Sequence, residues 1–192
     1  MANTDSPNGF TPVKHLTGGT MRSAEMRIAD DYNTAIFNGD MVKLAADGTI
    51  EVASAGNRVV GVFAGCKFTK DDGAIVYSKH WPASQSVLGS YATAYVYTDP
   101  NIVYRAQSSG ASGIADIGQL ADMISTHAGS TTTGRSGQEV NTTTGTGTAQ
   151  VRILEFINDG ANDPASDNAE MLVVIHEHEY NQHIDADGTP GV

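Results

Sequence analysis

Short apolar runs separated by turn residues dominate the chain between residues 36 and 66. The β-prone runs in this stretch are divided by residue pairs that favour tight turns, namely Asn38-Gly39, Asp47-Gly48 and Gly56-Asn57. Glycine, asparagine and aspartate tolerate positive φ, so Asn-Gly and Asp-Gly between apolar runs are strong signals for a β-hairpin. The pattern therefore predicts a meander of short strands.

Residues 91–97 alternate strictly between two kinds of side chain. One set of positions carries Tyr91, Thr93, Tyr95 and Tyr97, and the other carries Ala92, Ala94 and Val96. Successive side chains of a strand point to opposite faces, so this period of two predicts a strand with an aromatic face and a small-residue face. A turn at 99–101 then leads into a further strand, IVYRAQ.

Three other parts of the chain leave alternatives open. Residues 23–34 suit either a helical turn or an edge strand. Residues 114–124 suit either a short helix or an irregular strand, since Gly118 weakens a helix by about 1 kcal/mol relative to alanine. The Thr/Gly-rich residues 125–148 predict either a pair of polar strands or a projecting loop, because a compact domain seldom keeps so long a segment without structure.

Two apolar runs near the C-terminal end, residues 149–158 and 170–180, predict the last strands of the domain. Both runs carry apolar residues on both faces, which is typical of central strands in a sandwich or barrel. Together with the earlier strands, they predict an all-β fold with at most one or two short helices, in the form of a compact β-barrel or β-sandwich.

The expected organisation is a single β-rich domain over residues 23–185, with the long polar insert inside it. Residues 1–22 are expected to form an extended N-terminal arm, which either frays or adds a strand to the sheet edge of a neighbour. Residues 186–192 are expected to form a flexible tail.

Composition narrows the classes of function. The chain has 192 residues, 40% hydrophobic and 17% charged, which is enough to bury a core of its own. Its net charge is −11 and its 11 basic side chains are scattered, which argues against direct binding of nucleic acid. No apolar segment approaches the roughly 20 residues that span a bilayer, and the first ten residues lack the pattern of a signal peptide. We therefore expect a protein made in the cytoplasm, without membrane contact.

The histidines near the C-terminal end are the strongest candidates for metal chemistry. His176 and His178 would share one face of a strand, as paired metal-binding histidines often do. The third ligand would be His183, or a histidine from elsewhere such as His15, His80 or His127. The metalloprotease pattern needs a second histidine four residues after the first, and it is absent here. The alternative is a strand that leaves the core and exposes polar side chains.

No other motif supports catalysis. The sequence around Ser112 and Ser136 lacks the spacing of a nucleophile elbow, and the chain has no glycine-rich phosphate loop. The single cysteine, Cys66, ends an apolar run and is expected to be a buried, inert thiol. The acidic residues between 159 and 170 could hold calcium, but their spacing is not that of an EF-hand, which favours simple solvation. We therefore expect no enzyme activity, no cofactor and no metal ion.

Aromatic residues supply the candidates for a binding surface. Trp81, the only tryptophan, is either a core aromatic at a strand end or an anchor for a partner, since tryptophan is enriched among binding hot spots. The alternating tyrosines pose the same choice, because amphipathic rings suit contacts that are packed but partly wet. The predicted interface residues are Phe10, Val13, Trp81, Tyr91, Tyr95 and Tyr97.

The meander of residues 36–66, together with DGAIVYSKHWPAS at 72–84, resembles the start of small capsid decoration proteins of tailed bacteriophages, also called cement or head-stabilising proteins. The likeness continues more weakly through YVYTDPN, ADIGQLAD, TGRSGQE and VRILEF. It rests on turns and strand alternation, and it covers most of the chain.

The resemblance implies a non-enzymatic virion protein, often a homotrimer, on the outer surface of an expanded phage capsid. Its partners would be the major capsid protein and copies of itself, and it would stabilise contacts between capsomers. The family has no catalytic residues to carry over. Three alternatives stay open: another head or appendage structural protein of a phage, a zinc-binding enzyme, and a carbohydrate-binding β module.

Overall fold

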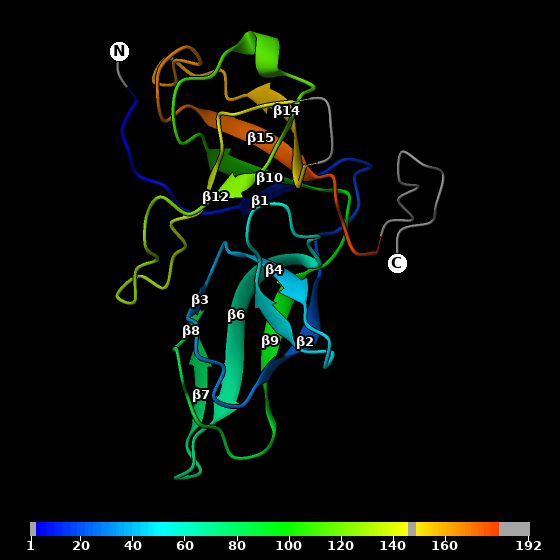
Figure 1. The fold of residues 1–192 in the computed structure, drawn as a ribbon, viewed down its shortest axis with the longest axis vertical. Helices are drawn as coiled ribbons and strands as arrows, with labels where there is room; N and C mark the ends of the chain where they lie inside the picture. The colour runs from blue at the N-terminus through cyan, green and yellow to red at the C-terminus, as the bar shows by residue number, and fades with distance from the viewer. Residues whose placement is uncertain (1–2, 146–148, 181–192) are drawn as a thin grey trace.

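The computed structural model describes residues 3–145 and 149–180, and this part of the chain contains β-strands and one turn of 3-10 helix, η1 (Ile114–Asp116). Two antiparallel sheets lie one above the other along the long axis of the molecule (Figure 1). The prediction of an all-β fold is confirmed. The sheets in the described residues do not close into a barrel, which leaves the sandwich as the architecture.

The upper sheet has five strands in the order β1-β10-β15-β14-β11. Its strands are β1 (Thr11–His15), β10 (Ile102–Gln107), β11 (Leu120–Ala121), β14 (Val151–Phe156) and β15 (Glu170–Ile175). The two apolar runs near the C-terminal end form β14 and β15, which pair with each other inside the sheet. Their central position matches the prediction from apolar residues on both faces.

The lower sheet has six strands in the order β2-β9-β6-β4-β5, with β7 also paired to β6. Its strands are β2 (Ser23–Ala29), β4 (Met41–Leu44), β5 (Ile50–Val52), β6 (Gly61–Thr69), β7 (Ile75–Ser78) and β9 (Tyr91–Tyr97). Residues 23–34 therefore contain the edge strand, not the helical turn. Two small ribbons complete the fold: β3 (Ile36–Phe37) with β8 (His80–Trp81), and β12 (Met123–Ile124) with β13 (Glu139–Val140).

The predicted alternation along β9 is confirmed. Ala92, Ala94 and Val96 are buried, while the residues between them are half-buried or exposed. The small side chains line the core of the lower sheet, where they pack with Ile28 from β2 and Phe63 from β6. A second core lies between the sheets and joins residues of the upper sheet to Met41 and Val62 of the lower one.

Of the predicted turns, Asp47-Gly48 and Asn38-Gly39 differ in whether they close a hairpin. Asp47-Gly48 closes the hairpin between β4 and β5, as predicted. Asn38-Gly39 does not close a hairpin, because β3 pairs with β8 and not with β4. Here the turn is a crossing point: Gly39 accepts a bond from the Phe10 amide and donates one to the Phe63 carbonyl, both at 2.9 Å.

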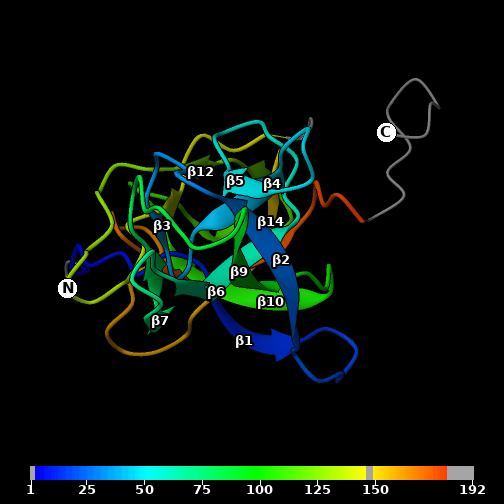
Figure 2. The same cartoon turned by 90° about the horizontal axis from the view of Figure 1, so that it is seen from below.

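The N-terminal segment is extended, but it belongs to its own domain. β1 pairs with β10 from Thr11↔Arg105 to His15↔Ile102, so it forms an edge of the upper sheet (Figure 2). Phe10 has no exposed surface and lies in the core between the sheets. The expectation of an arm that starts at residue 1 and joins the domain only at residue 23 is therefore wrong, because β10 offers an edge and the core has a place for Phe10.

The polar insert at 125–148 is neither a pair of polar strands nor only a projecting loop. Its part from Ser136 to Val140 is buried, and β13 pairs with β12 of the adjoining segment. Gln138 accepts a bond from the Met41 amide through Oε1 at 2.8 Å, and Ser136 donates its amide to the Asn38 carbonyl. The insert therefore fills space between the sheets, beside β3 (Figure 1). Residues 146–148 and the predicted tail at 186–192 lie outside the described residues.

Candidate functional site

The outer face of the lower sheet gathers side chains that lie far apart in the sequence. In one row of paired residues, Arg27, Thr93, Lys67 and Tyr77 stand side by side across β2, β9, β6 and β7. Directly paired residues of antiparallel strands point to the same face, and so do residues two positions away on each strand. We call this surface the tyrosine face. It includes Arg27, Lys67, Ile75, Tyr77, Tyr91 and Tyr95, together with Thr93 and with Glu25, which pairs with Tyr95.

The tyrosine face is open to solvent. The exposed fractions are 70% for Tyr77, 61% for Ile75 and 48% for Tyr91. The Arg27 guanidinium lies 5.4 Å from the centre of the Tyr91 ring, and the Lys67 ammonium lies 5.6 Å from that of Tyr77. Cations at these distances interact favourably with the ring faces, so each basic side chain stabilises the position of its tyrosine.

A shallow hollow of about 300 Å³ lies between Tyr77 and Tyr95, with Gly65 among its lining residues. Gly65 stands opposite Tyr95 at a bulge of β6 and has a φ of +146°. A side chain there would meet the Ser78 carbonyl oxygen at 2.9 Å. The glycine thus lets β7 approach β6 and leaves room between the two rings for a side chain of a partner.

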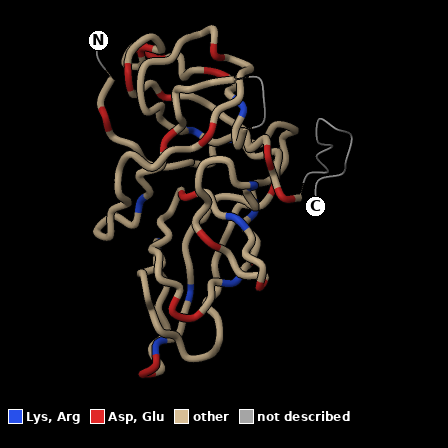
Figure 3. The backbone as a smooth tube through the Cα atoms, in the orientation of Figure 1, with Lys and Arg blue, Asp and Glu red and all other residues tan. Residues whose placement is uncertain are grey.

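Charge is spread thinly over the molecule. Basic residues occur singly along the backbone in both sheets, and acidic residues outnumber them (Figure 3). Arg27 and Lys67 are therefore local positive charges on a chain whose net charge is −11. The expectation that the basic side chains are scattered agrees with this arrangement.

Two predicted interface residues lie in the core. Trp81 has no exposed surface, and its indole N–H donates to the Tyr32 carbonyl at 3.1 Å. Phe10 is likewise fully buried. The expectation that these two side chains contact a partner is wrong, because the apolar surface of each is already covered within the chain.

The other four predicted interface residues reach the surface to different degrees. Tyr91 and Tyr95 belong to the tyrosine face. Tyr97 is half-buried and packs against the core between the sheets. Val13 is 42% exposed, but it lies on β1 of the upper sheet. The structure thus brings two of the six together, and it adds Ile75 and Tyr77, which sequence reasoning did not single out.

The histidines near the C-terminal end do not form the predicted pair. β15 ends at Ile175, because the amides of His176 and Glu177 both turn to the Gln150 carbonyl. His178 is fully buried, accepts a bond from the Tyr180 amide at Nδ1, and has a pKa that burial lowers to about 4. Among the described residues, neither histidine belongs to a group of three ligand side chains, and His183 lies outside them.

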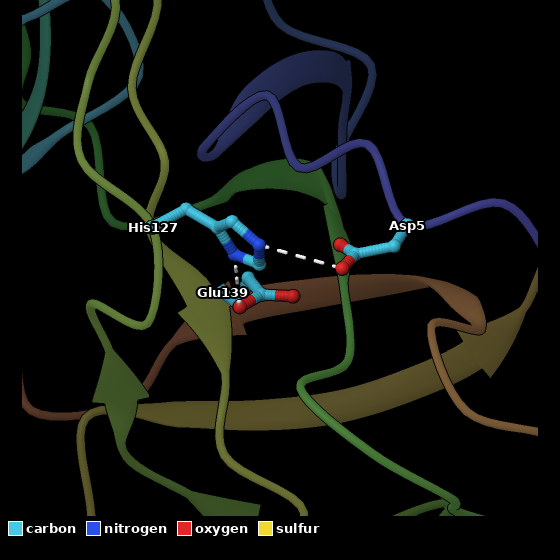
Figure 4. A group of neighbouring side chains, drawn as sticks. All are labelled: Asp5, His127 and Glu139. Carbon is cyan, nitrogen blue, oxygen red and sulfur yellow. Dashed lines mark hydrogen bonds and ion pairs between the residues drawn. The ribbon is translucent and has the colours of Figure 1, made fainter.

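A different group of ligand side chains was missed by sequence reasoning. Asp5, His127 and Glu139 converge from the N-terminal segment, the polar insert and β13 (Figure 4). The His127 ring nitrogens lie 3.4 Å from the Asp5 carboxylate and 3.3 Å from that of Glu139. Only His127 had been considered as a ligand, because residues 5, 127 and 139 share no local pattern.

The remaining candidate residues have structural uses. Cys66 is buried, its S–H donates to the His80 carbonyl, and burial raises the pKa of its thiol to about 12, as expected of an inert cysteine. The acidic segment 159–170 holds the N-terminal segment: the Asn3 side chain bonds the backbone of Asp163 in both directions and also the Asp167 carbonyl. The calcium alternative gains no support from these contacts.

Helices of the length and apolarity needed to cross a bilayer do not occur in the described residues. Comparisons of the chain with family models, with curated proteins and with solved structures found no match.

Proposed function

We propose that the protein is a non-enzymatic virion protein that binds the outer surface of an expanded phage capsid and stabilises the contacts between capsomers. The observation that carries this proposal is the tyrosine face. It is an exposed sheet surface on which aromatic, aliphatic and basic side chains lie together, two of the rings in contact with cations. The resemblance of residues 36–84 to capsid decoration proteins supplies the identity of the partner.

The composition of the face suits a protein partner. Tyrosine and arginine are enriched at protein interfaces, and tyrosine loses little conformational entropy when it is fixed. Exposed apolar groups that cluster on one face often mark interaction sites. The hollow between Tyr77 and Tyr95 can receive a side chain of the capsid protein.

Mass action explains how such a protein would stabilise a shell. A ligand that binds only the assembled, expanded capsid shifts the equilibrium toward that state. In a homotrimer, three copies of the face would act together, so a modest affinity per copy gives strong attachment through effective concentration. Sedimentation velocity measures whether the free protein is a trimer.

Co-sedimentation with expanded capsids of the phage that encodes this chain, prepared without the protein, tests the proposal. We expect saturable binding at a fixed ratio to the major capsid protein, and no binding to unexpanded shells. Absence of saturable binding at high protein concentration would overturn the proposal. Binding to a tail or fibre fraction instead would favour a different structural role in the virion.

A pair of variants tests the surface itself. The double change Tyr77→Ala with Tyr91→Ala removes two exposed rings and should weaken capsid binding by at least about tenfold, since buried interface tyrosines often contribute more than 1.4 kcal/mol each. The matched control is Tyr180→Ala, which removes a 57% exposed ring outside this sheet. If the double variant bound capsids as tightly as Tyr180→Ala and the wild type, another surface would make the contact.

A further inference from the structure

We propose that Asp5, His127 and Glu139 form a binding site for Zn²⁺. One ligand atom from each of the three side chains lies within 4.8 Å of the other two (Figure 4). Asp5 comes from the N-terminal segment, and His127 and Glu139 come from two parts of the polar insert, so the fold brings the three together. This inference does not rest on the proposed capsid role.

Glu139 is the strongest reason for a cation at this place. Its side chain is 1% exposed, and one carboxylate oxygen, Oε1, is buried without a hydrogen-bond partner among the described residues. The other oxygen, Oε2, accepts a bond from the Thr126 hydroxyl and lies 3.3 Å from His127 Nδ1. Buried carboxylate oxygens are normally satisfied by a donor or a cation, so the free oxygen marks a place where a positive ion would be stabilised.

Burial also acts on the titration of this group. Desolvation raises the pKa of the Glu139 carboxyl, and the neighbouring His127 opposes that shift. The buried position of Glu139 Oε1 without a donor, and not this shift, marks the site.

The donor set selects the kind of ion. Zn²⁺ takes imidazole nitrogen and carboxylate oxygen at about 2.0–2.2 Å, whereas calcium and magnesium prefer oxygen donors alone. Neighbouring ligands of a tetrahedral zinc are about 3.4 Å apart. The Asp5 and Glu139 carboxylates lie 3.4 Å and 3.3 Å from opposite ring nitrogens of His127, so only one of these separations can belong to a single ion.

The ion would bind one of the two ring nitrogens. Since the carboxylates face opposite nitrogens, one carboxylate has to move, and Asp5 is the mobile partner because its side chain is 50% exposed. The Glu139 carboxylate stays fixed in the interior. The side chain of His127 is 45% exposed, so water completes the coordination and the ion has an open path of entry.

Such a site would fasten the N-terminal segment to the insert between the sheets. Asp5 lies five residues before Phe10, and Glu139 lies on β13 beside the core. Zinc would bind the folded chain and not the unfolded one, so it would raise the midpoint of thermal unfolding.

Equilibrium dialysis of the EDTA-treated full chain against ZnCl₂, with metal measured by mass spectrometry, tests the site. We expect one zinc per chain for the wild type. His127→Ala should lose it, and Asp5→Asn should bind at least about tenfold more weakly. The matched control is His15→Ala, which removes a different histidine–carboxylate pair, His15 with Asp99 at 3.0 Å, and should keep the zinc.

A second readout separates zinc binding from a simple ion pair. Co²⁺ that replaces Zn²⁺ at a site of low coordination number gives absorption bands in the visible. These bands should appear with the wild type and not with His127→Ala. Circular dichroism checks that each variant is folded. Failure of the wild type to bind stoichiometrically, or binding that survives His127→Ala and disappears with His176→Ala, would overturn the assignment.

Discussion

At the scale of single residues, buried polar side chains hold the two sheets together. Gln150 has no exposed surface, accepts a bond from the Met123 amide, and donates to the carbonyls of Ser54 and Asn57 at the edge of the lower sheet. Gln138 is similarly placed against Met41. Satisfied buried amides fix one arrangement of the chain, because any other arrangement leaves them without partners.

Asp40 is a buried carboxyl group whose ionisation lowers the stability of the folded state. It is 5% exposed, and burial raises the pKa of its carboxyl from 3.8 to about 6, against the bonds from the Phe37 amide and Ser136. The folded state therefore binds this proton more tightly than the unfolded state. The contribution of Asp40 to stability is most favourable below about pH 4, and it declines as the pH rises to about 6.

Asp40→Asn should therefore raise the free energy of unfolding at pH 7 by about 1–2 kcal/mol, with the gain vanishing near pH 4. Urea denaturation across this pH range measures the difference. Asp47→Asn is the matched control: hydrogen bonds from Thr49 lower the pKa of Asp47, so its neutralisation should bring no gain at pH 7. A loss of stability in Asp40→Asn at pH 7 would mean that the bonds to the carboxylate outweigh its desolvation.

Residue type predicted burial only partly. The inert Cys66 was predicted because it ends an apolar run, and the alternation of β9 was predicted from its period of two. Trp81 was left between core and interface, because an aromatic residue near a strand end suits both, and the structure places it in the core. Phe10 was assigned to an interface because it was expected to lie on an arm outside the domain. Glu139 could not be found, because its neighbours are distant in sequence.

At the scale of elements, the turn at Asn38-Gly39 shows how close packing departs from local pattern. Gly39 has a φ of +98°, and a Cβ atom there would meet the Asn8 carbonyl oxygen at 2.9 Å. The N-terminal segment crosses directly over this turn. The residue pair therefore serves a long-range crossing, although its sequence signal is that of a hairpin.

Gly39→Ala should lower the free energy of unfolding by about 2–4 kcal/mol, because it adds both an unfavourable φ and a backbone clash. Gly48→Ala provides the control. Gly48 also has a positive φ, +80°, but a Cβ atom there meets no atom within 4 Å. Its cost should be only about 1 kcal/mol. Thermal and urea denaturation of the two variants compare them, and equal costs would contradict the role given to the crossing.

Long alternating or apolar runs predicted strands well, and the pairing of very short elements escaped prediction. β3 was predicted as the start of the meander, but it pairs with β8. β3, β8, β12 and β13 have two residues each, so their pairing depends on the surrounding fold and not on their own periodicity. The segment at 114–124 illustrates this, since it forms one 3-10 turn and then the short strands β11 and β12. Its apolar spacing suited a helix, but Gly118 has a φ of +88°, which ends the turn.

At the scale of the whole molecule, one long ribbon connects the sheets. β1 pairs with β10 in the upper sheet, and β2 pairs with β9 in the lower one, with Leu16 bonded to Asn101 between them. The chain thus enters the lower sheet along one side of the ribbon and returns along the other. Residues 11–15, which form β1, are therefore part of the ribbon that joins the two sheets.

Deletion of residues 2–15 should lower the free energy of unfolding by at least about 4 kcal/mol, because removal of a buried phenylalanine alone costs about 3–5 kcal/mol. The deletion also exposes the edge of β10. Calorimetry of the deletion variant beside Val13→Ala, which trims an exposed side chain of the same strand, measures the effect. If the midpoint of thermal unfolding were unchanged by the deletion, residues 2–15 would not contribute to the stability of the domain.

The strand order also determines how the chain would respond to a pull on its two ends. β1 and β15 both flank β10, and their registers place Thr11 and Leu172 on either side of Arg105, and Lys14 and Val174 on either side of Val103. Tension applied before Thr11 and after Ile175 would slide β1 and β15 past β10 in opposite directions. Hydrogen bonds perpendicular to the strands then resist shear together instead of opening one by one. The lower sheet is inserted between β1 and β10, and it meets this load path where the Val59 backbone bonds Glu177 and Glu179.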